Sequence, residues 1–304
     1  MRIDDLLAKK FPKTVIVIAG PTASGKTAIA VELAKHYQAE IISADSRQCF
    51  KELNIGVARP SVDELSAVPH HFVASHSIHE KVDAALFEQY ALQKVNELFE
   101  QNDIVIIAGG TGLYIKAFCE GMDEIPEVKP GIREKIVKQF AEKGKEWLQE
   151  EIQKKDPGFY MIGEIQNPQR MMRALEVLES TGQSILHFRK GNKAERNFNI
   201  VKIGLAISKE DLHQNINRRT EKMIEAGLVD EVRSLINERK LNALHTVGYT
   251  EIFDYLDNKI SLDTAIEQIK TNTRQYAKRQ LTWFKKDKEI RWMIREELIN
   301  EKGK

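Results

Sequence analysis

The sequence predicts an α/β fold, in which helices flank a parallel β-sheet and a separate helical segment is inserted into the chain. Four short apolar runs are typical of buried strands, and the segments between the first three have helical spacing. Such alternation of strands and helices favours a parallel sheet with helices on both faces. The predicted strands are residues 15–19, 40–44, 104–108 and 201–207.

The helices around this sheet follow from apolar residues at helical spacing. Residues 28–37 place Ile29 and Leu33 on one face, and residues 84–100 show the same spacing before a short polar turn. Near the C terminus, the apolar pattern predicts two long helices that return to the core. Their ranges are residues 211–240 and 261–286.

The strand-like runs disappear between about residues 118 and 199, where short charged helices follow one another. Gly144 is expected to break a helix there. Asn167 as N-cap with Pro168 at the first helical position predicts another helix, which ends near Gly182. We therefore predict a core made of residues 1–117 and 200–304, with residues 118–199 as a helical insertion domain.

Residues 20–27, GPTASGKT, match the pattern G-x-x-x-x-G-K-[ST] between a predicted strand and a predicted helix. Glycines let the backbone curl so that several N–H groups point at one anion, and the helix N terminus adds its dipole. Lys26 supplies a positive charge and Thr27 a hydroxyl that can face magnesium. A P-loop that binds a diphosphate or triphosphate is predicted, with a structural glycine turn as the alternative. The phosphate-binding candidates are Gly20, Thr22, Ala23, Ser24, Gly25, Lys26 and Thr27.

Two further strand ends carry candidate site residues. Asp45 follows the second strand, where ligands of open α/β sheets bind. Three roles stay open for it: a magnesium ligand, a general base near the phosphate, or a helix N-cap. Residues 109–114, GGTGLY, follow the third strand without the second carboxylate that a phosphotransferase usually needs. Its glycines and Thr111 could contact a ligand, or could serve tight packing between strand and helix.

Two groups of basic residues are candidates for binding phosphates. Arg170 and Arg173 lie at i, i+3 on one side of a predicted helix and could clamp a phosphate. On spacing alone, a solvated charged face is favoured there. Arg274, Lys278 and Lys285 share a stripe on the last long helix, which suits a nucleic-acid backbone, although most such runs are merely solvated.

Whole-chain composition narrows the classes of function. The 304 residues carry 46 Lys and Arg against 45 Asp and Glu, so the net charge of +1 gives no argument for a polyanionic partner. Cys49 and Cys119 have no C-x-x-C partner, and the eight histidines show no metal spacing, so neither a disulfide framework nor a zinc site is indicated. No apolar stretch approaches the roughly 20 residues that span a bilayer, and we expect a cytosolic protein.

Taken together and in order, six motifs between about residues 14 and 285 resemble the tRNA dimethylallyltransferase family, also called the IPP transferase family. The resemblance implies transfer of a dimethylallyl group from dimethylallyl diphosphate to N6 of adenosine 37, with Mg²⁺, in tRNAs that read codons beginning with U. The lack of zinc-finger cysteines fits a bacterial form, and we expect a monomer. The motifs are GPTASGKT at 20–27, DSRQ at 45–48, GGTGLY at 109–114, QRMMRALE at 169–176, VGY at 247–249 and KRQLTWF at 278–284.

The resemblance also implies roles for single residues. Asp45 is the base that accepts the N6 proton, and Thr111 contacts adenine or the diphosphate. Arg170 or Arg173 joins the P-loop at the diphosphate, and Thr27 faces Mg²⁺. The helical insertion and the basic C-terminal helix grip the anticodon stem-loop. The expected tRNA contacts are Asp45, Ser46, Arg47, Gln48, Thr111, Gln169, Arg170, Met171, Met172, Arg173, Gly248, Tyr249, Arg274, Lys278, Arg279 and Gln280.

Three other classes remain as alternatives, and one motif departs from the family. A nucleotide or small-molecule kinase fits the P-loop and Asp45, but not a third strand without an acid. A prenyltransferase of free adenosine phosphates would share the donor site but would not need the basic helix at 261–286. A noncatalytic RNA-binding protein would need neither Lys26 nor Asp45. Residues 245–247, HTV, stand where relatives often place glutamine and alanine, so RNA contacts there are less safely carried over.

Overall fold

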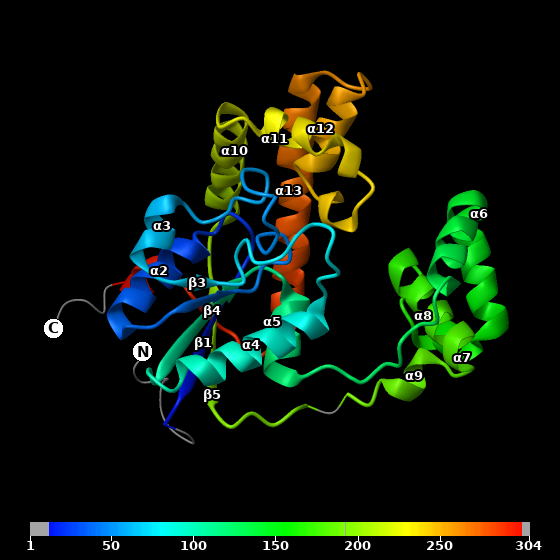
Figure 1. The fold of residues 1–304 in the computed structure, drawn as a ribbon, viewed down its shortest axis with the longest axis horizontal. Helices are drawn as coiled ribbons and strands as arrows, with labels where there is room; N and C mark the ends of the chain where they lie inside the picture. Colours follow the sequence, from blue (N-terminus) through cyan, green and yellow to red (C-terminus); the bar gives the residue numbers. More distant parts are fainter. Residues whose placement is uncertain (1–11, 192, 300–304) are drawn as a thin grey trace. The chain divides into compact units, whose positions relative to one another are not determined.

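The computed structural model describes residues 12–191 and 193–299. The chain divides into two compact units (Figure 1): Met1–Cys119 with Glu195–Lys304, and Glu120–Ala194. The second unit interrupts the first in sequence, at bounds a few residues from the predicted 118 and 199. In the part of the chain that the structure describes, no helix is long and apolar enough to span a membrane.

A six-stranded sheet in the order β3-β2-β4-β1-β5-β6 forms the centre of the larger unit, and all its neighbouring strands are parallel. The predicted α/β class is confirmed, since the four predicted strands are β1, β2, β4 and β5. The two remaining strands lie at the sheet edges and are too short to show a pattern. The strands are β1 Thr14–Ala19, β2 Ile41–Ser43, β3 His70–His71, β4 Ile104–Gly109, β5 Asn199–Leu205 and β6 Arg291–Met293.

Both faces of the sheet are covered, because alternate residues of β1 belong to different hydrophobic clusters. Val15 and Val17 pack in one cluster, and Ile16 and Ile18 in the other, all with no exposed surface. Such a strand, buried on both faces, is apolar throughout. The first cluster receives side chains from α4 Ala84–Leu98, α5 Gly112–Glu120 and α13 Leu262–Phe284, and the second from α2 Lys26–Tyr37 and α14 Arg295–Ile299.

The C-terminal helices differ from the prediction in one respect. A single helix over 211–240 is wrong, because Gly227 adopts φ +98° between two helices. Glycine reaches this conformation without steric cost. The long helix predicted over 261–286 is present as α13. The other elements are α3 Val62–Ala67, α10 Lys209–Glu225, α11 Leu228–Ser234, α12 Tyr249–Leu256 and the 3₁₀ turns η1 Ile236–Glu238 and η2 Asn242–Leu244.

The insertion unit consists of helices around a small core of its own. Gly144, with φ +80°, interrupts the helical geometry inside the first of them, where the break was predicted. Asn167 caps α8 by accepting hydrogen bonds from the N–H groups of Gln169 and Arg170, and Gly182 ends that helix with φ +75°. The helices are α6 Ile132–Lys155, α7 Pro157–Ile162, α8 Pro168–Thr181 and α9 Ile185–Phe188.

Candidate phosphate-binding and transfer site

Three parallel strands end at the same edge of the sheet and bring the candidate residues together. Ala19 of β1 is paired with Gly109 of β4, and Ser43 of β2 with Ala108. The P-loop, the Asp45 segment and the GGTG segment therefore begin next to one another. A pocket of about 1270 Å³ opens at this edge, lined also by α10, α13 and the segments around residues 54–61 and 245–251.

The P-loop leads from β1 into α2 as the sequence predicts. Gly25 occupies the N-cap position of α2 with φ +88°, and no side chain caps the helix, so its first N–H groups are open to an anion. Ser24 Oγ donates to the carbonyl of Pro21 at 2.8 Å. The P-loop residues that line the pocket are Thr22, Ala23, Gly25, Lys26 and Thr27.

Lys26 folds back onto its own loop, where Nζ donates to the carbonyl of Pro21 at 2.5 Å. Burial lowers the pKa of this amine to about 7; the Asp45 carboxylate opposes the shift, and the Arg219 guanidinium adds to it. A bound polyanion would supply the negative charge that this environment lacks.

Asp45 has a capping role, although for a turn and not for a helix, and the roles of general base and magnesium ligand stay predictions. Oδ1 accepts hydrogen bonds from the N–H groups of Arg47 at 2.9 Å and Gln48 at 3.3 Å, so the side chain caps the turn after β2. Both bonds use the same oxygen, which leaves Oδ2 able to accept a proton without breaking them. Asp45 also lines the pocket together with Ser46, Arg47 and Gln48.

The GGTG segment packs tightly against protein atoms. A Cβ on Gly109 would lie 2.2 Å from the carbonyl oxygen of Ala44, and one on Gly112 would lie 2.2 Å from the ring of Trp283. Thr111 Oγ1 accepts from the N–H of Ser46 at 3.0 Å and fastens the Asp45 turn. Packing therefore explains these glycines, and contact of Thr111 with a substrate stays a prediction.

Sequence reasoning missed Arg219, which α10 places in the pocket beside the P-loop. Burial lowers the pKa of its guanidinium, while the Asp45 carboxylate acts in the opposite direction. A signal was present in the sequence, because Arg219 lies seven residues after Leu212 and so falls on the buried stripe that contains Leu212, Ile216 and Met223. An arginine in such a stripe indicates a charged partner or ligand in the interior.

Four of the expected tRNA contacts have buried side chains, and their contact with tRNA stays a prediction. Met171 and Met172 belong to the core of the insertion unit, because the α8 face that carries them packs inward. Tyr249 is buried, and its hydroxyl donates to Glu231 at 2.5 Å. Gln280 is 7% exposed and bonds backbone groups on two loops of the core.

The remaining expected tRNA contacts have different environments. Arg274 donates through Nη2 to Asn217 of α10 at 2.7 Å, so its guanidinium joins two helices. Gln48 Nε2 donates to the carbonyl of Ala58 at 2.9 Å and holds the pocket wall. Gly248, also buried, begins α12 with φ +99° and lines the pocket. Lys278 and Arg279 are exposed on α13, and Gln169 is exposed on α8.

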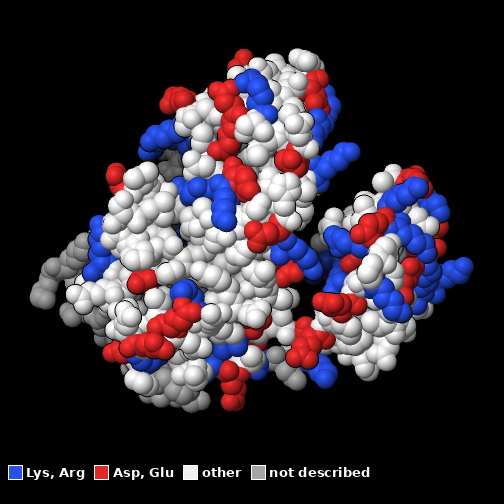
Figure 2. All heavy atoms as spheres, in the orientation of Figure 1, with Lys and Arg blue, Asp and Glu red and all other residues white. Residues whose placement is uncertain are grey.

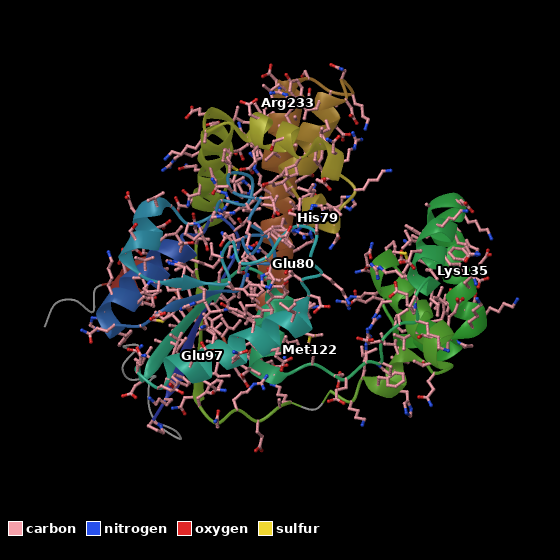
Figure 3. All side chains as sticks on the ribbon, in the orientation of Figure 1. His79, Glu80, Glu97, Met122, Lys135 and Arg233 are labelled. Carbon is pink, nitrogen blue, oxygen red and sulfur yellow. The ribbon has the colours of Figure 1, made fainter. Side chains whose placement is uncertain are left out.

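Arg170 and Arg173 lie on α8, as expected, and both are paired with acids of the insertion unit. Arg170 forms an ion pair with Glu164, and Arg173 Nη1 lies 3.4 Å from Glu176. Partial burial and the nearby Arg170 guanidinium lower the pKa of Arg189, so a third arginine lies close to this pair. Lys135 of α6 lies on the surface of the same unit (Figure 3), 3.8 Å from Glu179. The ion pairs of Arg170 and Arg173 each use Nη1, so other N–H groups of the two guanidinium groups can still donate to a phosphate.

A glycine-rich loop between a buried strand and a helix N terminus, with Lys26 at its end and Arg219 in the same pocket, defines an α/β protein with a candidate phosphate-binding loop. The model of the family described as IPP transferase matches residues 48–287, and this chain belongs to that family. The chain is similar to the tRNA dimethylallyltransferase of Cytophaga hutchinsonii, with 47% identity over 280 residues that cover 92% of each chain. It is equally similar to that of Christiangramia forsetii, with 47% identity over 278 residues, 91% of this chain and 92% of the relative.

Solved structures show the same fold. The full-length tRNA isopentenylpyrophosphate transferase of Bacillus halodurans has a TM-score of 0.67 and 34% identity, covering 93% of this chain and 90% of its own. A eukaryotic dimethylallyltransferase acting on tRNA has a TM-score of 0.77 and 25% identity, covering 93% of this chain and 74% of its own. Both proteins act on tRNA according to their descriptions.

Proposed function

We propose that this protein transfers a dimethylallyl group from dimethylallyl diphosphate to N6 of adenosine 37 in tRNAs that read codons beginning with U. Relatives that share nearly its full length are named tRNA dimethylallyltransferases. The main observation that supports the proposal is that residues of the P-loop, Asp45 and Arg219 line the same pocket. We further propose that the enzyme acts in the cytoplasm. We also propose that it is a monomer, and light scattering of the purified protein tests this oligomeric state.

The donor's diphosphate is the group that the P-loop end of the pocket suits. Breaking the allylic C–O bond leaves negative charge on the diphosphate, and positive groups that are already in place stabilise it. The N–H groups at the start of α2, Lys26 and Arg219 supply that stabilisation. No water needs activation, which agrees with the absence of a carboxylate after β4 in GGTG.

The acceptor amine of adenosine loses a proton as the new C–N bond forms, and Asp45 is the base that takes it. Hydrogen bonds from the N–H groups of Arg47 and Gln48 fix the carboxylate through Oδ1, so Oδ2 is available for the proton. A carboxylate suffices because the amine becomes strongly acidic only late in the transfer.

Magnesium would bind with the diphosphate. Mg²⁺ is usually held by one or two protein oxygens together with substrate phosphates. The Thr27 hydroxyl lines the pocket and suits this mode. Among the described residues, no three His, Cys, Asp or Glu side chains form a metal cluster, so the site fits a substrate-borne ion. When bound, Mg²⁺ would offset the charge of the leaving diphosphate.

Diphosphate binding is expected to become weaker as the pH rises above about 7. Bound diphosphate favours the protonated amine, so it raises the pKa of Lys26 and the complex takes up a proton. Below the pKa of the free enzyme Lys26 is already protonated, so its contribution to the affinity is complete and no longer changes with pH. Calorimetry of inorganic diphosphate binding at pH 8, in buffers of different ionisation enthalpy, measures the uptake. A Lys26→Met variant should show none, and equal uptake in both proteins would contradict the assignment.

The exposed basic residues of α13 are the proposed contacts with the tRNA backbone. Both signs of charge are interspersed on the visible face of the molecule (Figure 2), in line with the net charge of +1, so the contacts must be local. The Lys278→Ala/Arg279→Ala double variant should bind tRNA more weakly and lower the slope of log K against log salt by about two. Filter binding over a salt series measures it.

Lys35→Ala is a suitable control for that experiment. Lys35 is also exposed, but it lies near the C-terminal end of α2, whereas the P-loop lies at the N-terminal end. The control should keep the wild-type slope. An unchanged slope in the double variant would remove α13 from the RNA interface.

The decisive experiment incubates the protein with magnesium, labelled dimethylallyl diphosphate and either unmodified tRNA or AMP, followed by mass analysis of the nucleosides. Prenylated adenosine at position 37 of the tRNA supports the proposal. Prenylated AMP alone would identify an enzyme of free nucleotides. Consumption of ATP without prenyl transfer would identify a kinase.

A further inference from the structure

Gln280 links two loops of the core, a role that its place in the KRQLTWF motif does not indicate. Its side chain projects from α13 into the core, where it is 7% exposed. Oε1 accepts a hydrogen bond from the backbone N–H of Thr22 at 2.8 Å, and Nε2 donates to the carbonyl of Gly110 at 2.8 Å. One amide thus joins the P-loop to the segment that follows β4.

The Thr22 end of this bridge bears on the phosphate-binding geometry. Thr22 directly follows Pro21, whose carbonyl accepts from both Lys26 Nζ and Ser24 Oγ. The turn that Gln280 holds is therefore the one on which the lysine of the P-loop rests. Asn215 of α10 supports the next residue through a 3.2 Å bond from Nδ2 to the carbonyl of Ala23.

The Gly110 end of the bridge is built to admit this one side chain. A Cβ on Gly110 would lie 2.3 Å from Gln280 Nε2, closer than any real contact allows. One turn further along α13, Trp283 packs over Gly112 in the same way. Two glycines of GGTG thus allow α13 to pack closely against the end of β4. This close packing holds the amide of Gln280 at a defined position.

We propose that Gln280 is a positioning residue of the transferase, which fixes the first turn of the P-loop for the donor's diphosphate and does not contact tRNA. The inference rests on the proposed function, because it takes the diphosphate to bind at the P-loop. Gln280 lines the pocket, but its Oε1 and Nε2 are bonded to the Thr22 N–H and the Gly110 carbonyl, so the amide is held by protein atoms and not by RNA. Removal of the amide should allow the Thr22 turn to move and weaken interactions with the diphosphate.

The test replaces Gln280 by methionine, which has a similar length and no hydrogen-bonding amide. With saturating tRNA, the KM for dimethylallyl diphosphate should rise about tenfold, the value of one lost hydrogen bond, and kcat should also fall. The Kd for tRNA should stay within about twofold of the wild type, since no RNA contact is lost. The matched control is Gln275→Met, the same change at an exposed glutamine of the same helix, which should leave all three constants unchanged.

Gly110→Ala tests the same bridge at the Gly110 end. It provides the test by itself if Gln280→Met does not fold. The added methyl group should displace the amide and raise the donor KM similarly. In the double variant the two effects should not add, because both act on the same bond. An unchanged donor KM in folded Gln280→Met and Gly110→Ala proteins would overturn the inference. So would a loss of tRNA affinity with an unchanged donor KM, which would make Gln280 an RNA contact.

Failure of the proposed function has a different signature. If the wild type transfers no dimethylallyl group to tRNA, and Lys26→Met does not alter its binding of inorganic diphosphate, the donor site itself is wrongly assigned. If the wild type transfers the group and Lys26→Met impairs it while the two bridge variants do not, only the role of Gln280 is wrong.

Discussion

Asp45→Asn is expected to lower kcat by about 10² to 10⁴, the usual contribution of a general base, with little change in tRNA affinity. Asparagine keeps an oxygen that can accept from the N–H groups of Arg47 and Gln48, so the turn after β2 should persist. It cannot take the proton from N6. Single-turnover kinetics with preformed enzyme–tRNA complex measures the chemical step, and filter binding measures the affinity.

Asp83→Asn provides a control of the same chemistry. Asp83 caps α4 by accepting from the N–H groups of Ala85 and Leu86, and it is exposed away from the residues that line the pocket. This variant should retain wild-type kcat. A kcat for Asp45→Asn within a few-fold of the wild type would rule out Asp45 as the base. Collapse of tRNA binding would show that its capping role dominates.

Lys26→Met is expected to lower kcat/KM for the donor by about 10² to 10³, the cost of removing one preorganised group that stabilises developing charge. The variant should be at least as stable as the wild type. The folded-state pKa of about 7 is below the ordinary 10.5, so protonation of Lys26 opposes folding below pH 10.5, and the opposition reaches its full size below pH 7. Thermal unfolding at pH 6 together with donor kinetics measures both effects.

Lys35→Met is the matched control, since it changes an exposed lysine at the other end of α2. It should leave kcat/KM unchanged. A lower melting temperature for Lys26→Met with proportionate loss of activity would mean that Lys26 supports the fold and not the leaving group.

Local sequence was sufficient where neighbouring residues alone set the structure. The apolar run of β1, the glycines of residues 20–27 and the start of α2 adjoin one another, so their joint pattern identified the P-loop. The position of Asp45 at a strand end followed in the same way. Residue spacing alone left its role open, because a cap and a base use the same carboxylate, and the structure allows both.

Periodicity failed where burial is set by a distant partner. Met171 and Met172 were expected at an RNA surface, but α6 and α7 pack on that face of α8. Gln280 was expected there too, yet Gly110, 170 residues earlier, leaves the space that its amide occupies. Arg219 was missed although it falls on the buried stripe of α10, because the Asp45 carboxylate whose charge acts on it lies far away in the sequence.

Residues close together in the chain, or motifs in a fixed order, were enough to predict the α/β class, the strand–loop–helix unit suited to phosphate, and the family. The folded structure was needed to show which polar side chains face the pocket and which hold it together. That choice depends on burial and on hydrogen bonds between α10, α13 and the ends of β2 and β4, which meet only when the chain folds.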